Sequence, residues 1–257
     1  MLFHGRRRKA MAAKTQEFSS VWTRPERQRR DQPALSREQI VAEALALLDT
    51  EGYEALSMRK LGTRLNAGAT SLYTHVTNKD EILELAIDEA FRDIRMPDAD
   101  TPENWRDELL RLGTDVRSAI LSHPWISTAM TGAGLAYLGP NLMRISNAML
   151  GLLDAAGFDD RTADRGANVF WSYIIGATSG ETAMLITIAR SGATEKEWFT
   201  QFMATADQAT RPYPHVAKRH DVYRNLDTTQ SREDFFGDEL RLILDGLELR
   251  RSRAAGK

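Results

Sequence analysis

The chain of 257 residues contains no cysteine, which excludes disulfide bonds, thiolate metal sites and cysteine nucleophiles. No apolar run approaches the roughly 20 residues that are needed to span a bilayer, and the N-terminus lacks the apolar block of a signal peptide. We therefore expect a cytoplasmic protein that makes no contact with a membrane.

The sequence also lacks the common signatures of catalysis. It has no phosphate-cradling glycine loop and no Gly-x-Ser-x-Gly elbow. Its five histidines are not spaced with carboxylates as helical metal ligands are, and His215 and His220 lie five residues apart rather than four. We expect no catalytic residue, no cofactor and no resident metal. An enzyme is the main rival class, and a metal carried by a chelating ligand stays an alternative, with His123 as its first candidate partner.

What the sequence does contain is helical periodicity from about residue 36 onward. Apolar residues recur at three- and four-residue spacing, 42% of the residues are hydrophobic, and no stretch alternates as a strand would. We expect an all-α protein with a domain boundary marked by Pro97 and Pro102. The expected helices cover 37–51, 58–65, 69–75, 79–92, 103–121, 125–132, 139–156, 161–190, 194–208, 213–225 and 232–251.

Residues 57–80, SMRKLGTRLNAGATSLYTHVTNKD, form the most informative stretch. Ser57 is suited to cap a first helix whose apolar side chains fall at helical spacing, and Gly68 suits a sharp turn before a second helix from about Ala69 to His75. Two short helices joined by a tight turn are typical of a DNA-reading helix-turn-helix. The alternative is an amphipathic helical hairpin that packs in a core.

On the second helix Leu72 and Val76 lie four apart and can pack inward, which leaves small polar and aromatic side chains exposed. Hydroxyl groups can bond base edges, and Tyr, His, Arg and Lys can reach phosphate oxygens. The candidate DNA-contacting residues are Ser57, Arg59, Ala69, Thr70, Ser71, Tyr73, Thr74, His75 and Lys79. Lys79, just after the helix, is expected to anchor a phosphate.

The segments LSMRKLGTRL and LYTHVTNKDEIL, the latter with Tyr73, His75, Asn78 and Lys79, resemble the DNA-binding domain of the tetracycline-repressor (TetR) family in order and in spacing. The resemblance covers about residues 36–91. The ending DELRLILDGLELR, at 238–250, is similar to the last helix of the C-terminal domain of that family.

The resemblance implies a three-helix helix-turn-helix domain at 36–95 and a larger helical ligand-binding and dimerisation domain at 96–257. It also implies a homodimer that binds a palindromic operator in double-stranded DNA, most often as a repressor, and that a small-molecule effector releases. One departure is Asn66, which stands where the family usually has glycine. Asparagine tolerates a left-handed backbone better than most residues, so we expect the turn to survive.

Charge is unevenly distributed along the chain, whose formal net charge is -2. Residues 1–80 carry 14 Lys and Arg against 9 Asp and Glu, and the remainder carries 20 against 27. Residues 1–35 are basic with little apolar periodicity, which predicts a flexible arm able to lie along phosphates or to enter a minor groove. The alternative is a solvated tail, part of which precedes a second candidate start at Met11.

Two helices of the C-terminal domain are suited to dimerisation. The helix at 161–190 mixes small residues with large apolar ones, and the helix at 232–251 has more leucine than one core face accommodates. As in the family that the chain resembles, we expect an intermolecular four-helix bundle. Burial of both helices within the monomer is the alternative, but a two-fold dimer presents two recognition helices to a palindromic site.

Aromatic residues and methionines of the C-terminal domain are candidate walls of an effector pocket, because they suit a hydrophobic or aromatic small molecule. The candidate ligand-binding residues are His123, Trp125, Met130, Tyr137, Met143, Phe170, Trp171 and Met184. Polar orienting groups are expected from Asn141, Asn147, Asn168, Ser172, Thr178 or Glu181. The alternatives are that these residues are ordinary core and that the protein is an architectural DNA-binding protein without an effector pocket.

Overall fold

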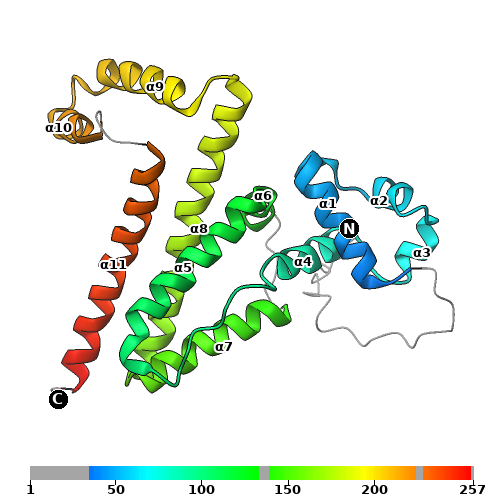
Figure 1. The fold of residues 1–257 in the computed structure, drawn as a ribbon, viewed down its shortest axis with the longest axis horizontal. Helices are drawn as coiled ribbons and strands as arrows, with labels where there is room; N and C mark the ends of the chain where they lie inside the picture. The colour runs from blue at the N-terminus through cyan, green and yellow to red at the C-terminus, as the bar shows by residue number, and fades with distance from the viewer. Residues whose placement is uncertain (1–34, 133–138, 224–227, 256–257) are drawn as a thin grey trace, which may run out of the picture.

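The computed structural model describes residues 35–132, 139–223 and 228–255, and all regular secondary structure within these ranges is helical. Figure 1 shows that helices α1 to α4 form a small lobe and helices α5 to α11 form a larger one. The all-α fold class and the pairing of a helix-turn-helix domain with a larger helical domain are confirmed. Residues 1–34 of the predicted basic arm lie outside the described residues.

The small lobe contains α1 (Arg37–Glu51), α2 (Met58–Arg64), α3 (Ala69–Tyr73) and α4 (Lys79–Ala90), with one 3-10 turn at Tyr53–Ala55. Three of these helices begin at a side chain that accepts a backbone N–H of the first turn and so satisfies a donor that the helix itself leaves unbonded. The capping residues are Ser36, Ser57 and Asn78. The capping predicted for Ser57 is therefore confirmed.

The turn between α2 and α3 depends on Asn66 and not on Gly68. Asn66 has a φ of 47°, the left-handed conformation expected of it. Gly68 has a φ of -62° and a ψ of 146°, which any residue can adopt, so the prediction that it makes the sharp turn was wrong. The glycine that the packing needs is Gly62, where an added Cβ would lie 3.1 Å from the carbonyl oxygen of Ala67. Helix α3 also ends at Tyr73, two residues before the predicted end.

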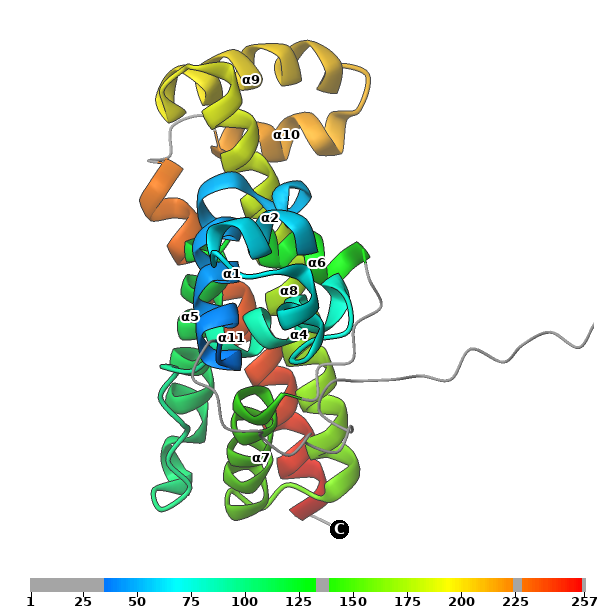
Figure 2. The same ribbon diagram turned by 90° about the vertical axis from the view of Figure 1, so that its right-hand side faces the viewer.

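The large lobe follows the predicted helices closely. Helix α11 extends four residues further at each end than expected, and the other boundaries differ by at most two residues. The helices are α5 (Trp105–Ser122), α6 (Trp125–Gly132), α7 (Pro140–Ala155), α8 (Asp160–Ser191), α9 (Glu195–Thr210), α10 (Pro214–Tyr223) and α11 (Thr228–Ala255), with a 3-10 turn at Pro102–Asn104. The long helices α8 and α11 lie side by side, and α9 and α10 lie together at one end of them (Figures 1 and 2).

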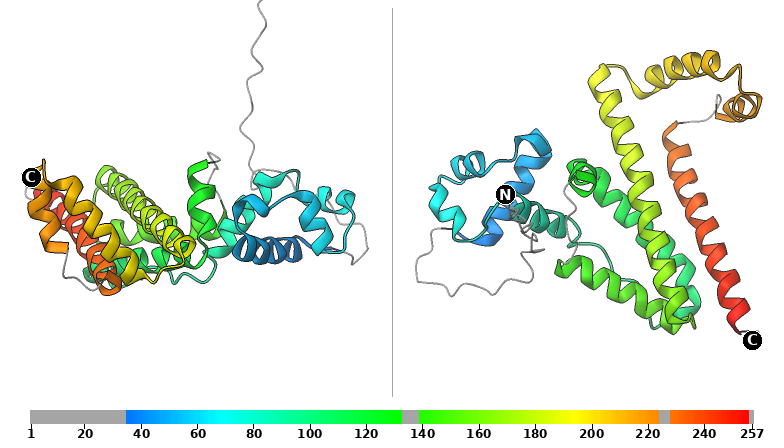
Figure 3. Two further views of the ribbon diagram at one scale, coloured as in Figure 1. Left: turned by 90° about the horizontal axis from the view of Figure 1, so that it is seen from above. Right: turned by 180° about the vertical axis from the view of Figure 1, so that it is seen from behind.

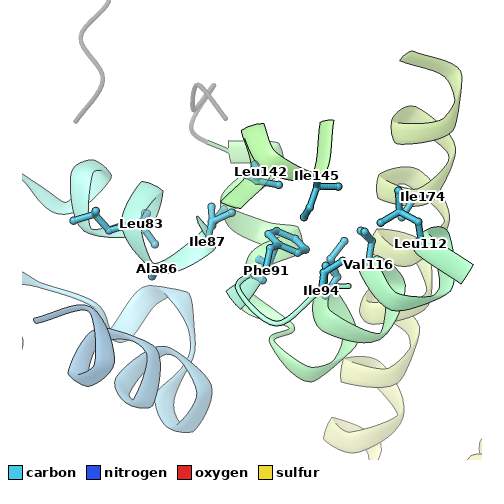
Figure 4. Close-up of a cluster of buried hydrophobic side chains, with 14 of the residues drawn as sticks. Leu83, Ala86, Ile87, Phe91, Ile94, Leu112, Val116, Leu142, Ile145 and Ile174 are labelled. Atoms are coloured by element: carbon cyan, nitrogen blue, oxygen red, sulfur yellow. The ribbon is translucent and has the colours of Figure 1, made fainter. Parts of the chain in front are cut away.

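Helix α4 joins the two lobes. The small lobe stands to one side of the large one (Figure 3), and α4 runs between them. Its side chains Leu83, Ala86 and Ile87 are at most 1% exposed. The same apolar cluster continues into the large lobe, where Figure 4 shows it passing through Phe91, Ile94, Leu112, Val116, Leu142, Ile145 and Ile174. Both lobes therefore share one hydrophobic core.

Candidate nucleic-acid interface

The recognition helix α3 presents to solvent the side chains that the sequence assigns to DNA contact. Leu72 and Val76 face inward, with exposed fractions of 0% and 1%, and belong to the shared core. The exposed or half-buried side chains are Thr70, Ser71, Tyr73, Thr74 and His75. Their predicted exposure is confirmed, while their contact with DNA stays a prediction.

The hydroxyl groups of α3 differ in what they can offer a base pair. Thr74 Oγ1 donates to the carbonyl oxygen of Ser71 at 2.6 Å, so toward solvent it can only accept a hydrogen bond or present its methyl group. Within the described residues, the hydroxyls of Thr70 and Ser71 have no protein partner. These two groups can therefore both donate and accept at a DNA surface.

Most cations of the small lobe are already paired. Lys60 and Arg64 of α2 both bind Glu51 of α1, and Arg64 also binds Glu43. The hydrogen bond from Lys60 and the positive charges of Lys60 and Arg64 hold the pKa of the Glu51 carboxyl below its ordinary value. Two further pairs are Arg92 with Glu89 at 2.6 Å and Arg95 with Glu108 at 2.9 Å. These side chains are not free point charges for phosphate binding.

Lys79 is engaged as well, whereas Arg59 is not. The Lys79 Nζ lies 4.2 Å from the centroid of the Tyr53 ring and donates to the carbonyl oxygen of Tyr53 at 3.2 Å. An ammonium group has three donors, so a phosphate contact by Lys79 stays a prediction. Arg59 is exposed on α2 and has no partner in the part of the chain that the structure describes. Arg37 at the start of α1 is half-buried and also has no side-chain partner among the described residues, and the sequence did not single it out.

The folded small lobe is acidic overall. Residues 35–95 carry 7 Lys and Arg against 11 Asp and Glu, so the positive excess of the front of the chain belongs to residues 1–34, which carry 9 against 3. The exposed face of α3 is polar rather than basic. Such a surface is suited to hydrogen bonds with base edges more than to general attraction by phosphates.

The candidate effector residues lie in different surroundings. His123 Nδ1 and Trp125 Nε1 each contact Asp49 Oδ1 of α1 at 2.7 Å. Phe170 is 1% exposed and lies edge-on to Trp171, and Met143 is 43% exposed. The half-buried candidates are Met130, Trp171 and Met184, and Tyr137 lies outside the described residues. Ligand contact by these eight residues stays a prediction.

The inner face of α8 carries polar groups in the core. Thr178 and Thr182 are 0% and 3% exposed. Ser127 Oγ of α6 donates to Thr182 Oγ1 at 3.3 Å, whereas Thr178 Oγ1 has no hydrogen-bond partner among the described residues. A buried hydroxyl without a partner costs about 1–3 kcal/mol. Thr178 is therefore a buried polar group that the described residues leave unbonded.

A buried ion network next to these residues holds four helices together. Arg117 of α5 donates to both carboxylate oxygens of Glu181 of α8, at 2.8 Å and 2.6 Å. Arg232 of α11 binds Glu181 at 3.1 Å and also binds Glu195 of α9. Because both oxygens of Glu181 are occupied, this carboxylate stabilises the fold. No short sequence pattern indicates its partner Arg117, 64 residues away.

Among the described residues, the outer faces of α8 and α11 carry exposed apolar and small residues. On α11, Leu242 and Leu249 are spaced by seven residues and are 70% and 52% exposed. On α8, Gly176 and Gly180 are exposed, and no atom lies within 4 Å of the position that a Cβ would take. Apolar residues at heptad spacing beside small residues suit close packing against helices of another chain.

Two negative findings apply to the described ranges alone. No three histidine, aspartate or glutamate side chains gather there as metal ligands would. No helix there is long and apolar enough to cross a bilayer.

Both parts of the chain match one family of proteins. Residues 40–86 match "Bacterial regulatory proteins, tetR family", and residues 96–251 match "Tetracyclin repressor-like, C-terminal domain". An HTH-type transcriptional regulator of Saccharopolyspora erythraea is 40% identical over 163 residues, which cover 63% of this chain and 68% of the relative. The HTH-type transcriptional repressor DrrR1 of Streptomyces coeruleorubidus is 28% identical over 219 residues, which cover 84% of this chain and 78% of the relative.

Solved structures agree with this assignment. Apo ActR from Streptomyces coelicolor has the same fold, with a TM-score of 0.71 at 24% identity over 87% of this chain and 100% of that one. ActR in complex with actinorhodin gives a TM-score of 0.68 at 26% identity over 83% and 95%. Because the helix-turn-helix lobe and the larger helical lobe both match in the order in which they occur, this chain belongs to the TetR family of transcriptional regulators.

Proposed function

We propose that this protein is a ligand-responsive transcriptional repressor that binds a palindromic operator as a homodimer and is released by a small-molecule effector. The observation that carries the proposal is α3, which is anchored from within by Leu72 and Val76 and holds its polar side chains toward solvent. We assign base-edge contacts to Ala69, Thr70, Ser71 and Thr74, and phosphate contacts to Ser57, Arg59, Tyr73, His75 and Lys79.

The basic segment at 1–34 completes the DNA-binding surface in this proposal. The small lobe is acidic, and four of its seven cations are paired with carboxylates. Much of the attraction to a polyanion therefore comes from elsewhere in the chain, and residues 1–34 hold the excess of Lys and Arg. These residues supply affinity that does not depend on sequence, and α3 supplies the choice of sequence.

Two features support a dimer: the short length of helix α3, and the exposed apolar and small residues of α8 and α11. A helix of five residues reads few base pairs, whereas a two-fold dimer places two such helices about 34–36 Å apart, one turn of DNA. The exposed heptad of α11 and the glycines of α8 offer the surface for such a dimer. A four-helix bundle of α8 and α11 from two copies covers both.

Repression and effector control draw on the relatives. DrrR1 is named a transcriptional repressor, and ActR has been solved in complex with actinorhodin. We infer a hydrophobic or aromatic effector that is seated in the large lobe, with Thr178 as a polar anchor. Release of DNA is limited by the difference between the affinities of the effector for the two conformations. A compound that binds tightly and leaves operator affinity unchanged would contradict effector control.

The proposal is tested by selecting bound sequences from a random DNA library with the full-length protein. We expect enrichment of a palindrome whose half-site centres lie about one helical turn apart, because two copies of α3 read it together. A protein that enriches no sequence, although it binds DNA, would support the alternative of an architectural DNA-binding protein.

The unpaired cation of α2 should contact a phosphate. Arg59→Ala is expected to lower operator affinity and to reduce the salt slope of binding by about 2, since a dimer loses two phosphate contacts of about 0.9 each. Fluorescence anisotropy at several salt concentrations measures this slope. Lys60→Ala is the matched control, because Lys60 is bound to Glu51 and should leave the slope nearly unchanged. Equal slopes for both variants would remove Arg59 from the interface.

The outer stripe of α11 should hold two copies together. Leu242→Glu is expected to give a folded monomer, because the dimer would bury two unpaired carboxylates, and sedimentation velocity measures the change in mass. Val216→Glu is the control, since Val216 is also exposed, at 52%, but lies on α10 away from the stripe. A Leu242→Glu protein that sediments as a dimer would show that α11 is not the interface.

The orphaned hydroxyl of α8 should reduce the stability of the ligand-free protein. Thr178→Val keeps the shape of the side chain and removes the unbonded donor, so the melting temperature should rise by about 2–4 °C, as a gain of about 1 kcal/mol implies for a chain of this size. Thr182→Val is the control and should show no gain, because it removes the acceptor of the Ser127 hydroxyl. A lower melting temperature for Thr178→Val would mean that the hydroxyl already has a partner.

A further inference from the structure

A carboxylate of the small lobe caps a helix of the large lobe. Asp88 lies on α4 and is 3% exposed. Its Oδ1 accepts the backbone N–H groups of Asn141 at 3.0 Å and Leu142 at 3.1 Å, and its Oδ2 accepts the side-chain amide of Asn141 at 2.9 Å. Helix α7 has no capping side chain of its own, because its N-cap residue is Gly139. Asp88 therefore replaces the missing cap from the other lobe.

The fit between the two helices leaves no spare room. A Cβ at position 139 would lie 2.1 Å from Asp88 Oδ1 and 2.6 Å from Asp88 Cβ, so only glycine fits while the carboxylate is in place. Asn141 Nδ2 also donates to the carbonyl oxygen of Asp88 at 3.1 Å, and Arg144 Nη2 donates to the carbonyl oxygen of Arg92 at 2.7 Å. The C-terminal end of α4 and the first turn of α7 are thus held in one arrangement.

A second carboxylate of the small lobe makes a similar contact nearby. Asp49, near the end of α1, accepts Trp125 Nε1 at the start of α6 and contacts His123 Nδ1, both at 2.7 Å. The two carboxylates thus bind the first residues of two successive helices of the large lobe, α6 and α7. The small lobe is fixed at two points, so it cannot turn about either one alone.

We propose that Asp88 is a positioning residue for operator binding, which sets the direction in which α4 carries the recognition helix. This inference rests on the proposed function. Helix α4 packs on α1, α1 packs on α2 and α2 packs on α3. Ile82 and Leu83 at the start of α4 are both 0% exposed in the shared core, so α3 follows α4 as a rigid unit. A displacement of α7 must then either carry α4 with it or break the cap.

Loss of the cap should lower the fraction of dimers whose two reading helices have the separation that the operator needs. The apparent dissociation constant rises as the inverse of that fraction. If one dimer in ten keeps the right separation, operator affinity falls about tenfold. Affinity for DNA of random sequence should not change, because the surface that contacts phosphates is intact.

The test uses full-length variants, the operator selected by the wild-type protein, and scrambled DNA of the same length. Asp88→Ala removes the cap, and Gly139→Ala displaces it from the other side. Asp88→Asn keeps an oxygen that can accept both backbone N–H groups, since asparagine caps as well as aspartate does, and it loses the bond that Oδ2 accepts from the side-chain amide of Asn141. The controls are Asp93→Ala, an exposed carboxylate just after α4, and Gly151→Ala, a position on α7 with nothing within 4 Å.

We expect Asp88→Ala and Gly139→Ala each to weaken operator binding about tenfold, to leave binding to scrambled DNA unchanged, and to be no worse when combined, because they break one contact. Asp88→Asn and both controls should bind as the wild type does.

Wild-type operator affinity in both Asp88→Ala and Gly139→Ala would overturn the proposal, and so would a tenfold loss in Asp93→Ala. If circular dichroism shows that Asp88→Ala is unfolded, Gly139→Ala and Asp88→Asn decide between the outcomes. A wild-type protein that selects no operator would instead contradict the proposed function.

Discussion

Burial of helix α4 is the constraint on which the rest of the molecule depends. Leu83 and Ile87 lie in the same apolar cluster as Ile145 and Ile174 of the large lobe, so the helix-turn-helix has no separate core that would let it swing freely. Packed interiors resist small displacements and favour a few discrete arrangements. An effector that alters the packing around α7 therefore has a mechanical route to α3 through one helix. The buried carboxylate of Asp88 strengthens the connection between α4 and α7, because a buried polar group that loses its hydrogen bonds costs free energy.

Electrostatics divide the work of DNA binding between two parts of the chain. Within the small lobe Glu51 and Glu43 bind Lys60 and Arg64 of α2, which leaves Arg59 and Arg37 unpaired among the described residues. Pairing Lys60 and Arg64 with α1 stabilises the angle between α1 and α2, at the expense of free positive charge on the surface. The exposed face of α3 carries mainly hydroxyl groups, which are suited to hydrogen bonds with base edges. In this account general affinity for DNA rests on residues 1–34, and specificity rests on the small lobe.

Local signals in the sequence predicted the helices well, because they are set by neighbouring residues. Ser57 bonds the third residue of its own helix, Asn66 adopts the left-handed conformation that asparagine tolerates, and Leu72 and Val76 fall on one helical face. Contacts between distant residues could not be read in this way. Lys79 faces Tyr53 rather than standing free, and Asp88 meets Asn141, 53 residues away. Such partners depend on how the helices pack, which one sequence does not encode in any short pattern. The prediction for Gly68 was wrong because a glycine indicates that a turn is near but does not show which residue of the turn has the positive φ.

In the proposed dimer, two copies of this chain hold two recognition helices at a separation fixed by the large lobes. Because the chain has no cysteine, a single cysteine introduced at the exposed position Thr63 of α2 carries one spin label per chain. Double electron–electron resonance then measures the distance between the two spin labels, one on each small lobe. The account predicts a dipolar signal in the free protein and a single narrow distance distribution once the selected operator is bound, as required by helices about 34–36 Å apart. The absence of a dipolar signal, or a distribution that the operator leaves broad and unchanged, would contradict it.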